Sequence, residues 1–208
     1  MKYFSGVEVG EPTVVKNSNV LPEKNRSLEK DFIRMAGLTK EQFSQIILLG
    51  EEKRVDRGNR DFQFRPVLPT YVPSGFHIEL FEAVSKPGAI GRGGWLGYTL
   101  IYVNQSSQCF DITVDTSQTG GPPDRHEELE VTSKALGDVT LAYTGFDKGY
   151  QTSYISFLHL PVILRGNDTK YFFTSPNGDR NQFKKECTRI DLKEAIRIVE
   201  NLEFVKTN

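Results

Sequence analysis

The fold class of this chain is decided by residues 98–114, which read YTLIYV-NQSSQC-FDITV. Two runs rich in β-branched and aromatic residues flank a polar turn, a pattern typical of paired antiparallel strands. In the second run Phe110, Ile112 and Val114 share one face, because side chains alternate along a strand. Cys109 then lies on the other face, which is either exposed or covered by another element.

Similar short runs on both sides of this hairpin predict more strands. In the nearest run Phe76, Ile78 and Leu80 alternate with a set that includes Phe81, as in a strand that buries one face. Turns rich in glycine, proline and asparagine predict short, mostly antiparallel connections. The predicted strands are 76–81, 98–103, 110–114, 128–132, 139–143, 154–159 and 171–174, with turns at 120–123, 137–138 and 166–168.

The last predicted element is a helix that begins after Asp191. Asp191 has the form of an N-cap, and Glu194 stands at the third helical position of a capping box. An apolar stripe must be covered by another layer. The predicted fold is therefore α+β, a curved antiparallel sheet packed by a C-terminal helix. The stripe of this helix is Leu192, Ala195, Ile196, Val199 and Leu202.

The sequence before the sheet predicts a helical arm. Residues 1–26 mix proline, asparagine and charges and predict an extended lead-in. Apolar residues at helical spacing over 28–36 predict a helix that ends at Gly37. Thr39-Lys40-Glu41-Gln42 has the form of a capping box and predicts a second helix as far as Gly50.

Two interpretations of this arm remain open. The interleaved charges of residues 53–65 predict a solvated linker, which divides the chain into an arm, 1–65, and a domain, 66–208. The two helices also have the form of a helix-turn-helix, so DNA binding through the Thr39–Leu49 helix is an alternative. That helix carries Glu41 among its polar residues, which favours packing on the main domain or on a neighbour.

Composition argues against a nucleic-acid partner. The 208 residues hold 26 Lys and Arg against 27 Asp and Glu, a net charge of -1, whereas nucleic acids and anionic membranes favour a basic excess.

No apolar run reaches the roughly 18 residues of a membrane helix. Residues 1–8 lack the apolar region of a secretory signal. We expect either a cytoplasmic protein or one whose export or membrane-anchoring segment is missing from this sequence.

Two cysteines, Cys109 and Cys187, are far apart and form no CxxC pair, so zinc and thioredoxin-like chemistry have no support. They are either two unrelated thiols or one disulfide. A disulfide requires an oxidising compartment. Cys187 lies just before the cap of the last helix, where a bridge to Cys109 would fix that helix to the sheet.

No motif for catalysis, a cofactor or a metal is found. The histidines His77, His126 and His159 have no metal-ligand spacing, and no serine nucleophile elbow is present. His126-Glu127-Glu128 lacks the second histidine of a zinc protease motif. A hydrolase that uses His77 or His159 in an unrecognised site is kept as an alternative.

The glycine-rich stretch 87–97 matches neither common phosphate-binding pattern, and strands rather than a helix flank it. It is interpreted as a flexible hairpin loop. Arg92 and Trp95 make it a candidate partner-contact loop, because arginine and tryptophan are enriched in binding hot spots. Aromatic residues of the predicted strands are interpreted as core residues. They are Tyr98, Tyr102, Phe110, Tyr143, Tyr154, Phe157, Tyr171, Phe172 and Phe173.

Three segments resemble a bacterial domain family of unknown function. Residues 68–76, LPTYVPSGF, resemble its L-P-x-Y-x-P-x-G-[FY] opening. Residues 171–175 and 191–202, the latter reading DLKEAIRIVENL, resemble its closing strand and its E-A-I-[KR]-I helix. Members are extracytoplasmic and occur in anti-sigma-factor-like and lipoprotein-carrier-like proteins. The resemblance implies a sensing or interaction module outside the cytoplasm and transfers no catalytic residue.

We therefore expect a non-enzymatic binding or sensory module of the periplasm or cell envelope. Its expected partner is a protein, or an apolar ligand bound over the sheet. The alternatives are the hydrolase and the DNA-binding regulator described above.

Overall fold

The computed structural model describes residues 23–56, 58–90, 92–116, 127–144, 154–159, 169–176, 178–180 and 185–206. The lead-in before residue 23, the turns at 120–123 and 166–168, and His126 lie outside these residues. The helices are α1 (Glu23–Ala36), α2 (Lys40–Glu51) and α3 (Leu192–Glu200). The strands are β1 (Arg54–Val55), β2 (Asp61–Phe62), β3 (Val67–Pro69), β4 (His77–Lys86), β5 (Trp95–Val103), β6 (Gln108–Asp115), β7 (Glu127–Ser133), β8 (Gly137–Tyr143), β9 (Tyr154–His159), β10 (Lys170–Pro176), β11 (Gly178–Arg180), β12 (Lys185–Arg189) and β13 (Leu202–Phe204).

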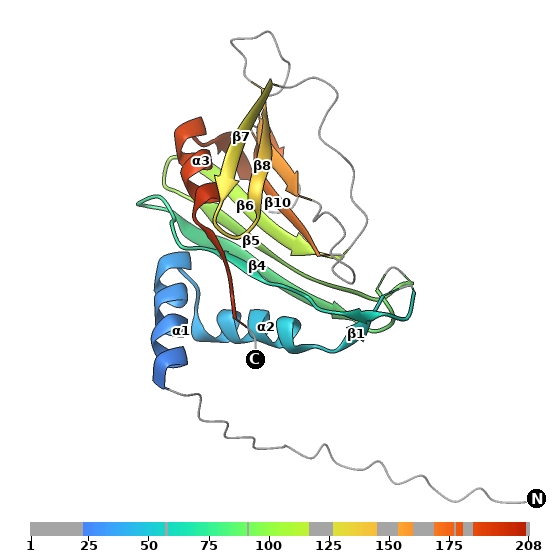
Figure 1. The fold of residues 1–208 in the computed structure, drawn as a ribbon. Helices are drawn as coiled ribbons and strands as arrows, with labels where there is room; N and C mark the ends of the chain where they lie inside the picture. The colour runs from blue at the N-terminus through green and yellow to red at the C-terminus, as the bar shows by residue number, and fades with distance from the viewer. Residues whose placement is uncertain are drawn as a thin grey trace, which may run out of the picture.

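The main sheet is an antiparallel path in the order β4-β5-β6-β10-β9-β8-β7 (Figure 1). Strands β7 and β8 run steeply across the direction of β4, so the sheet is strongly twisted, and it does not close. Beside the end of β10, β12 adds to β6 in parallel, with Thr188 opposite Gln108 and Arg189 opposite Cys109. The predicted α+β class with an antiparallel sheet is confirmed.

The hairpin predicted over residues 98–114 is present as β5 and β6 and lies at the centre of the core. The Phe110 ring packs against three others, with centroid distances of 4.6 Å to Tyr102, 5.9 Å to Phe173 and 5.3 Å to Phe76. This face is therefore filled by protein side chains. The register pairs the following buried residues on it: Tyr98 with Val114, Leu100 with Ile112, and Tyr102 with Phe110.

Helices α1 and α2 lie below β4 and β5 in Figure 1 and share the core of the sheet. The Tyr102 hydroxyl donates to the Ala36 carbonyl at 2.8 Å, which joins the end of α1 to β5. Gly37 ends α1 with φ of +68°, and Thr39 and Gln42 form the predicted capping box of α2. The predicted packing of the arm on the main domain is therefore present.

Residues 53–65 are not the solvated linker that their charges predict. Phe62 and Phe64 are buried in the core, and β1 pairs with β2 across a tight turn. Asp56 is also buried, and an ion pair with Arg60 compensates its charge. Charge alternation alone could not reveal these local partners.

Strand β4 differs from its predicted alternation. A bulge between Ile78 and Leu80 inserts one extra residue, so Ile78 and Phe81 come to lie on the same face. Phe81 packs against the core, whereas Leu80 was predicted to share the face of Ile78. The bulge depends on the pairing of β4 with β5, which the alternation within one strand does not report.

Helix α3 lies beside β7 in Figure 1 and buries Ala195, Ile198 and Val199. Asp191 caps it, as predicted, by accepting from the Lys193 backbone N–H at 2.7 Å. The predicted capping box does not form, because the carboxylate at the third helical position is bound by a tyrosine described below. The helix ends at Glu200, and Leu202 belongs to β13, which pairs with β3.

None of the helices in the described parts of the chain has both the length and the apolar character to cross a membrane.

Candidate partner-contact site

The β4–β5 hairpin ends in the glycine-rich loop that the sequence singles out. Lys86, the last residue of β4, is directly opposite Trp95, the first residue of β5. Arg92 is exposed and Trp95 is half-buried. The structure thus places both predicted contact residues at one end of the sheet, on or beside the loop.

Arg54 ties the base of this loop to the end of α2. Its guanidinium donates to the Glu52 carboxylate at 3.1 Å, to the Ser85 hydroxyl at 2.9 Å, and to the backbone carbonyls of Lys86 at 3.1 Å and Gly88 at 2.9 Å. The Ser85 hydroxyl lies 2.8 Å from the Glu52 carboxylate and closes the network. Only 10% of the Arg54 side chain is exposed, and its guanidinium makes charge-assisted hydrogen bonds within this network.

Asp56 holds the turn between β1 and β2. Its carboxylate accepts from the backbone N–H of Gly58 at 2.7 Å, the backbone N–H of Arg60 at 2.9 Å and the Arg60 guanidinium Nε at 2.6 Å. The hydrogen bonds from Arg60 lower the pKa of Asp56 below its ordinary value of 3.8. An ionised carboxylate therefore stabilises this turn.

Replacing Asp56 with asparagine is expected to destabilise the fold at neutral pH and to have little effect in strong acid. Because the folded-state pKa is depressed, the contribution of the carboxylate is present above the ordinary pKa of 3.8 and is lost as pH falls through the folded-state value. The measurement is the urea midpoint of both proteins at about pH 7 and about pH 2.

Asp61→Asn, at an exposed acid on the neighbouring strand, is the matched control and should shift the midpoint little at either pH. An Asp56→Asn effect of equal size in neutral solution and in acid would contradict the role of the charge.

The loop itself is bonded to β1. The Ile90 backbone N–H donates to the Val55 carbonyl at 2.8 Å, and Ile90 is buried in the core. The backbone N–H groups of Arg92 and Gly94 both donate to the Ala89 carbonyl, at 2.9 Å and 3.2 Å. Arg92 and Gly94 are therefore both hydrogen-bonded to Ala89 within the loop.

The glycines of the loop permit a close approach of backbone to backbone. Gly88 has a φ of +117°, which favours glycine, and a Cβ on Gly94 would lie 2.2 Å from the Gly88 carbonyl oxygen. The loop predicted to be flexible is thus bonded at its base and packed on itself. Gly88 and Gly94 serve this packing.

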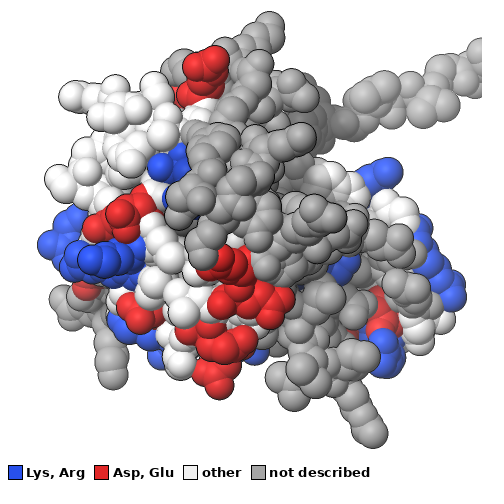
Figure 2. Space-filling model, turned by 90° about the horizontal axis from the view of Figure 1, so that it is seen from above, with Lys and Arg blue, Asp and Glu red and all other residues white. Residues whose placement is uncertain are grey.

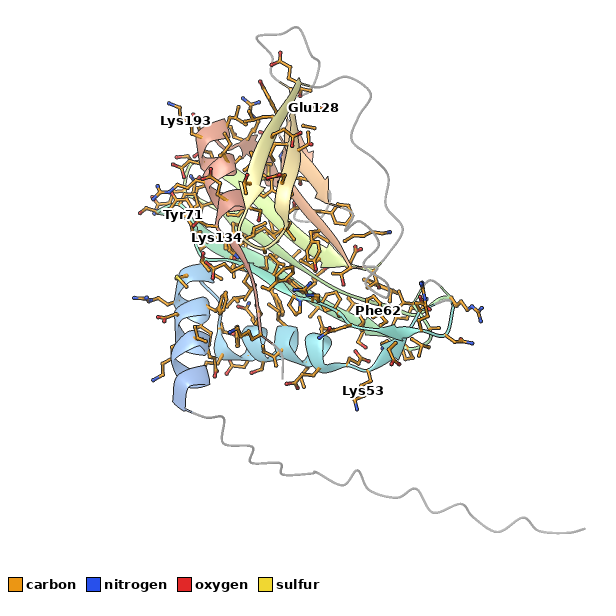
Figure 3. The ribbon with its side chains drawn as sticks, in the orientation of Figure 1. Lys53, Phe62, Tyr71, Glu128, Lys134 and Lys193 are labelled. Carbon is orange, nitrogen blue, oxygen red and sulfur yellow. A yellow bond between two sulfur atoms is a disulfide. The ribbon has the colours of Figure 1, made fainter. Side chains whose placement is uncertain are left out.

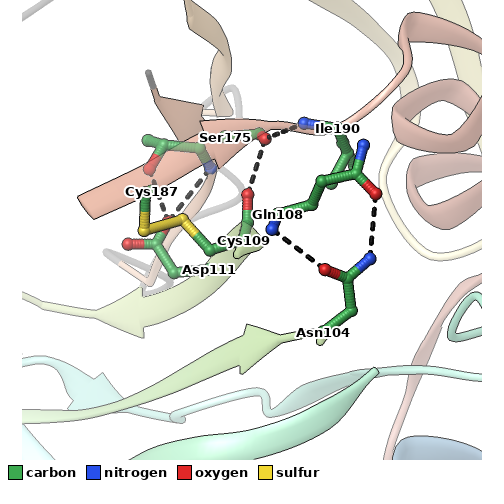
Figure 4. The surroundings of a disulfide bond; sticks show 8 residues. Asn104, Gln108, Cys109, Asp111, Ser175, Cys187 and Ile190 are labelled. Carbon is green, nitrogen blue, oxygen red and sulfur yellow. Dashed lines mark hydrogen bonds between the residues drawn. A yellow bond between two sulfur atoms is a disulfide. The ribbon is translucent and has the colours of Figure 1, made fainter. Parts of the chain in front are cut away.

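Cys109 and Cys187 form a disulfide that joins β6 to β12 (Figure 4). Both residues are buried, so Cys109 lies on a covered face. The Ser175 hydroxyl donates to the Cys109 carbonyl at 2.7 Å and accepts from the Ile190 N–H at 2.9 Å, which links β10 to the residue before the N-cap of α3. The bridge that the sequence allowed is therefore present, near the start of that helix.

The structure also places the residues on which the two alternative functions depend, namely the histidines of the hydrolase and helix α2 of the DNA-binding regulator. His77 is 61% exposed at its side chain, with Nε2 3.5 Å from the Glu79 carboxylate, so it is a surface pair rather than part of an enclosed site. The side chain of His159 lies outside the described residues. Helix α2 buries Phe43 and Ile46 and exposes Glu41 beside Lys40, a mixed surface that does not favour DNA.

Surface charge is mixed elsewhere too. Basic and acidic side chains are interspersed on the face shown in Figure 2. Figure 3 places Phe62 and Lys53 toward the end of the sheet that carries the loop, and Lys134 and Lys193 toward α3. Among the described residues drawn on this face, both signs of charge are present.

Two of the three segments that carry the family resemblance, 68–76 and 191–202, meet in space. The Tyr71 hydroxyl donates to the Glu194 carboxylate at 2.7 Å, and the Arg197 guanidinium lies 3.9 Å from the Tyr71 ring centroid. The hydrogen bond to Glu194 is the main cause of a raised Tyr71 pKa. β3, next to Tyr71, also pairs with β13, which follows α3. These contacts are structural and assign no binding residue.

Sequence reasoning did not identify Arg54, which fixes the base of the loop, or Asp56, which holds the turn between β1 and β2. Asp56 had a local signal, since Asp-x-Gly-Asn is typical of a tight turn. Arg54 had none, because its bonds to Lys86 and Gly88 span 32 and 34 positions.

The chain matches no family model, no curated protein and no solved structure.

Proposed function

We propose that this chain is a non-enzymatic binding or sensory module that works outside the cytoplasm and contacts a protein partner through the tip of the β4–β5 hairpin. The observation that carries the proposal is the Arg54 network. It fixes the base of the loop through Glu52, Ser85 and two backbone carbonyls while Arg92 stays exposed.

A fixed loop suits binding for an energetic reason. A partner that meets a preorganised surface does not have to order it, so less conformational entropy is lost on association. Arg92 and Trp95 supply the side-chain types that dominate binding energy in protein interfaces.

The proposed compartment is supported by the buried disulfide, since such bonds persist in oxidising environments. The family resemblance points to the same compartment.

A protein partner is favoured over an apolar ligand. An apolar ligand bound over the sheet needs exposed aromatic or aliphatic side chains, and five of the strand aromatics fill the core instead: Tyr98, Tyr102, Phe110, Tyr171 and Phe173. Tyr143 and Phe172 are half-buried, and the side chains of Tyr154 and Phe157 lie outside the described residues. The predicted assignment of aromatics to the core holds for these five, and it leaves the hairpin tip as the better contact surface.

A photo-crosslinking amino acid placed at position 92 tests the proposal in the native cell. We expect a discrete adduct, heavier than the chain by the mass of a different protein, in the envelope fraction. Trp95→Ala should reduce its yield by removing the neighbouring contact residue, and Arg54→Leu should reduce it by releasing the base of the loop.

The matched control carries the same photo-crosslinker at position 193, an exposed lysine toward the other end of the sheet (Figure 3). Equal adducts from both positions, or none from position 92, would reject the hairpin tip as the contact surface. An adduct confined to the cytosolic fraction would reject the compartment.

A further inference from the structure

Strand β4 forms one edge of the main sheet (Figure 1) and pairs only with β5 among the described strands. The bulge after Ile78 interrupts its first part, so the regular edge runs from Leu80 to Lys86. A regular strand edge presents backbone N–H and C=O groups that can pair with another chain.

Three exposed side chains follow one another on one face of this edge: Glu82, Val84 and Lys86. They share a face because side chains alternate along the strand. Val84 is 37% exposed, and the residue opposite it in β5 is Gly97, which has no side chain to cover it. An acid and a base thus flank an uncovered valine at equal spacing.

Symmetry restricts how a second copy can pair with this edge. Only alternate residues direct their backbone groups toward the edge, so two antiparallel copies must pair residues an even number of positions apart. Centring the pair on Val84 brings Glu82 of each copy opposite Lys86 of the other. Centring it on Glu82 or on Lys86 brings like charges together, which is destabilising. Centring it on Ala83 places Glu82 opposite Val84, so Glu82 and Lys86 no longer face each other.

We propose that the chain forms a symmetric homodimer by antiparallel pairing of β4, in the register centred on Val84. Two opposite-charge pairs between Glu82 and Lys86 then flank the contact between the two valines. Arg54 donates to the Lys86 carbonyl at 3.1 Å, and that oxygen keeps a second acceptor site for the partner strand. This inference concerns pairing of the chain with itself and does not depend on the proposed function.

Charge reversal tests the register. Glu82→Lys and Lys86→Glu should each raise the dimer dissociation constant by about tenfold or more, because each places two like-charge pairs across the interface. The double variant E82K/K86E restores opposite charges at both positions and should return the constant to near the wild-type value. Sedimentation equilibrium over a concentration series measures all four proteins, and circular dichroism checks that each is folded.

A cysteine pair tests the same register independently. Val84→Cys should form a disulfide-linked dimer on mild oxidation, because the two residues face each other at the symmetry axis. Val55→Cys is the matched control, since Val55 is 38% exposed and lies off this edge, and it should remain monomeric.

A wild-type chain that stays monomeric at all concentrations would overturn the proposal, as would single reversals without effect or a double variant that fails to restore pairing. Crosslinking from position 92 to a different protein does not require the dimer and would still be observed under each of these outcomes. Failure of the dimer and failure of the proposed function are therefore distinguishable.

Discussion

Replacing Cys109 and Cys187 together with alanine is expected to lower the free energy of unfolding by about 4 kcal/mol. The disulfide joins residues 78 positions apart and so restricts a large part of the unfolded chain. Both sites are buried, and alanine avoids burying the hydroxyls that serine would bring. Urea unfolding followed by the fluorescence of Trp95, the only tryptophan, gives the measurement.

Reductant supplies the control for this prediction. Dithiothreitol should move the unfolding midpoint of the wild-type protein toward that of the double variant and leave the variant itself unchanged. A variant that unfolds at the wild-type urea concentration would show that the bridge contributes little to stability.

Replacing Phe110 with alanine is expected to cost about 4 kcal/mol. Phe110 is fully buried and packs on the rings of Tyr102, Phe173 and Phe76, so the cavity left behind has rigid walls on three sides. The same urea titration measures the loss, and the wild-type circular dichroism spectrum should be retained.

Phe172→Ala is the matched control. Phe172 is half-buried and lies opposite Thr113, on the face of the sheet away from Phe110. Its removal should cost clearly less, because part of its surface is already in water. Equal losses from the two variants would mean that the face carrying Phe110 is not the main core.

Features within one strand or one helix could be predicted from the sequence. Side-chain alternation over 98–114 identified the set of β6 residues that share the aromatic core face, and the Thr39–Gln42 pattern identified the cap of α2. These signals are local, because the spacing of apolar residues and the chemistry of a cap require no knowledge of distant partners.

Features that depend on distant partners could not be predicted. The bulge in β4 arises from its register with β5, and β12 pairs with β6 in parallel although neither sequence signals a crossover. The Glu194 side chain was assigned to a capping box, but Tyr71, 123 positions away, binds it. At the candidate site, residue types identified Arg92 and Trp95, whereas the network that fixes the loop came only from the fold.

The pairing of β13 with β3 has a consequence for the order of synthesis. Residues 202–204 pair with residues 67–69, which leave the ribosome much earlier. Until β13 arrives, Val67 and Leu68, which are buried in the folded protein, lack their pairing strand. A nascent chain therefore keeps an apolar strand edge open through most of translation, the kind of segment that chaperones protect from aggregation.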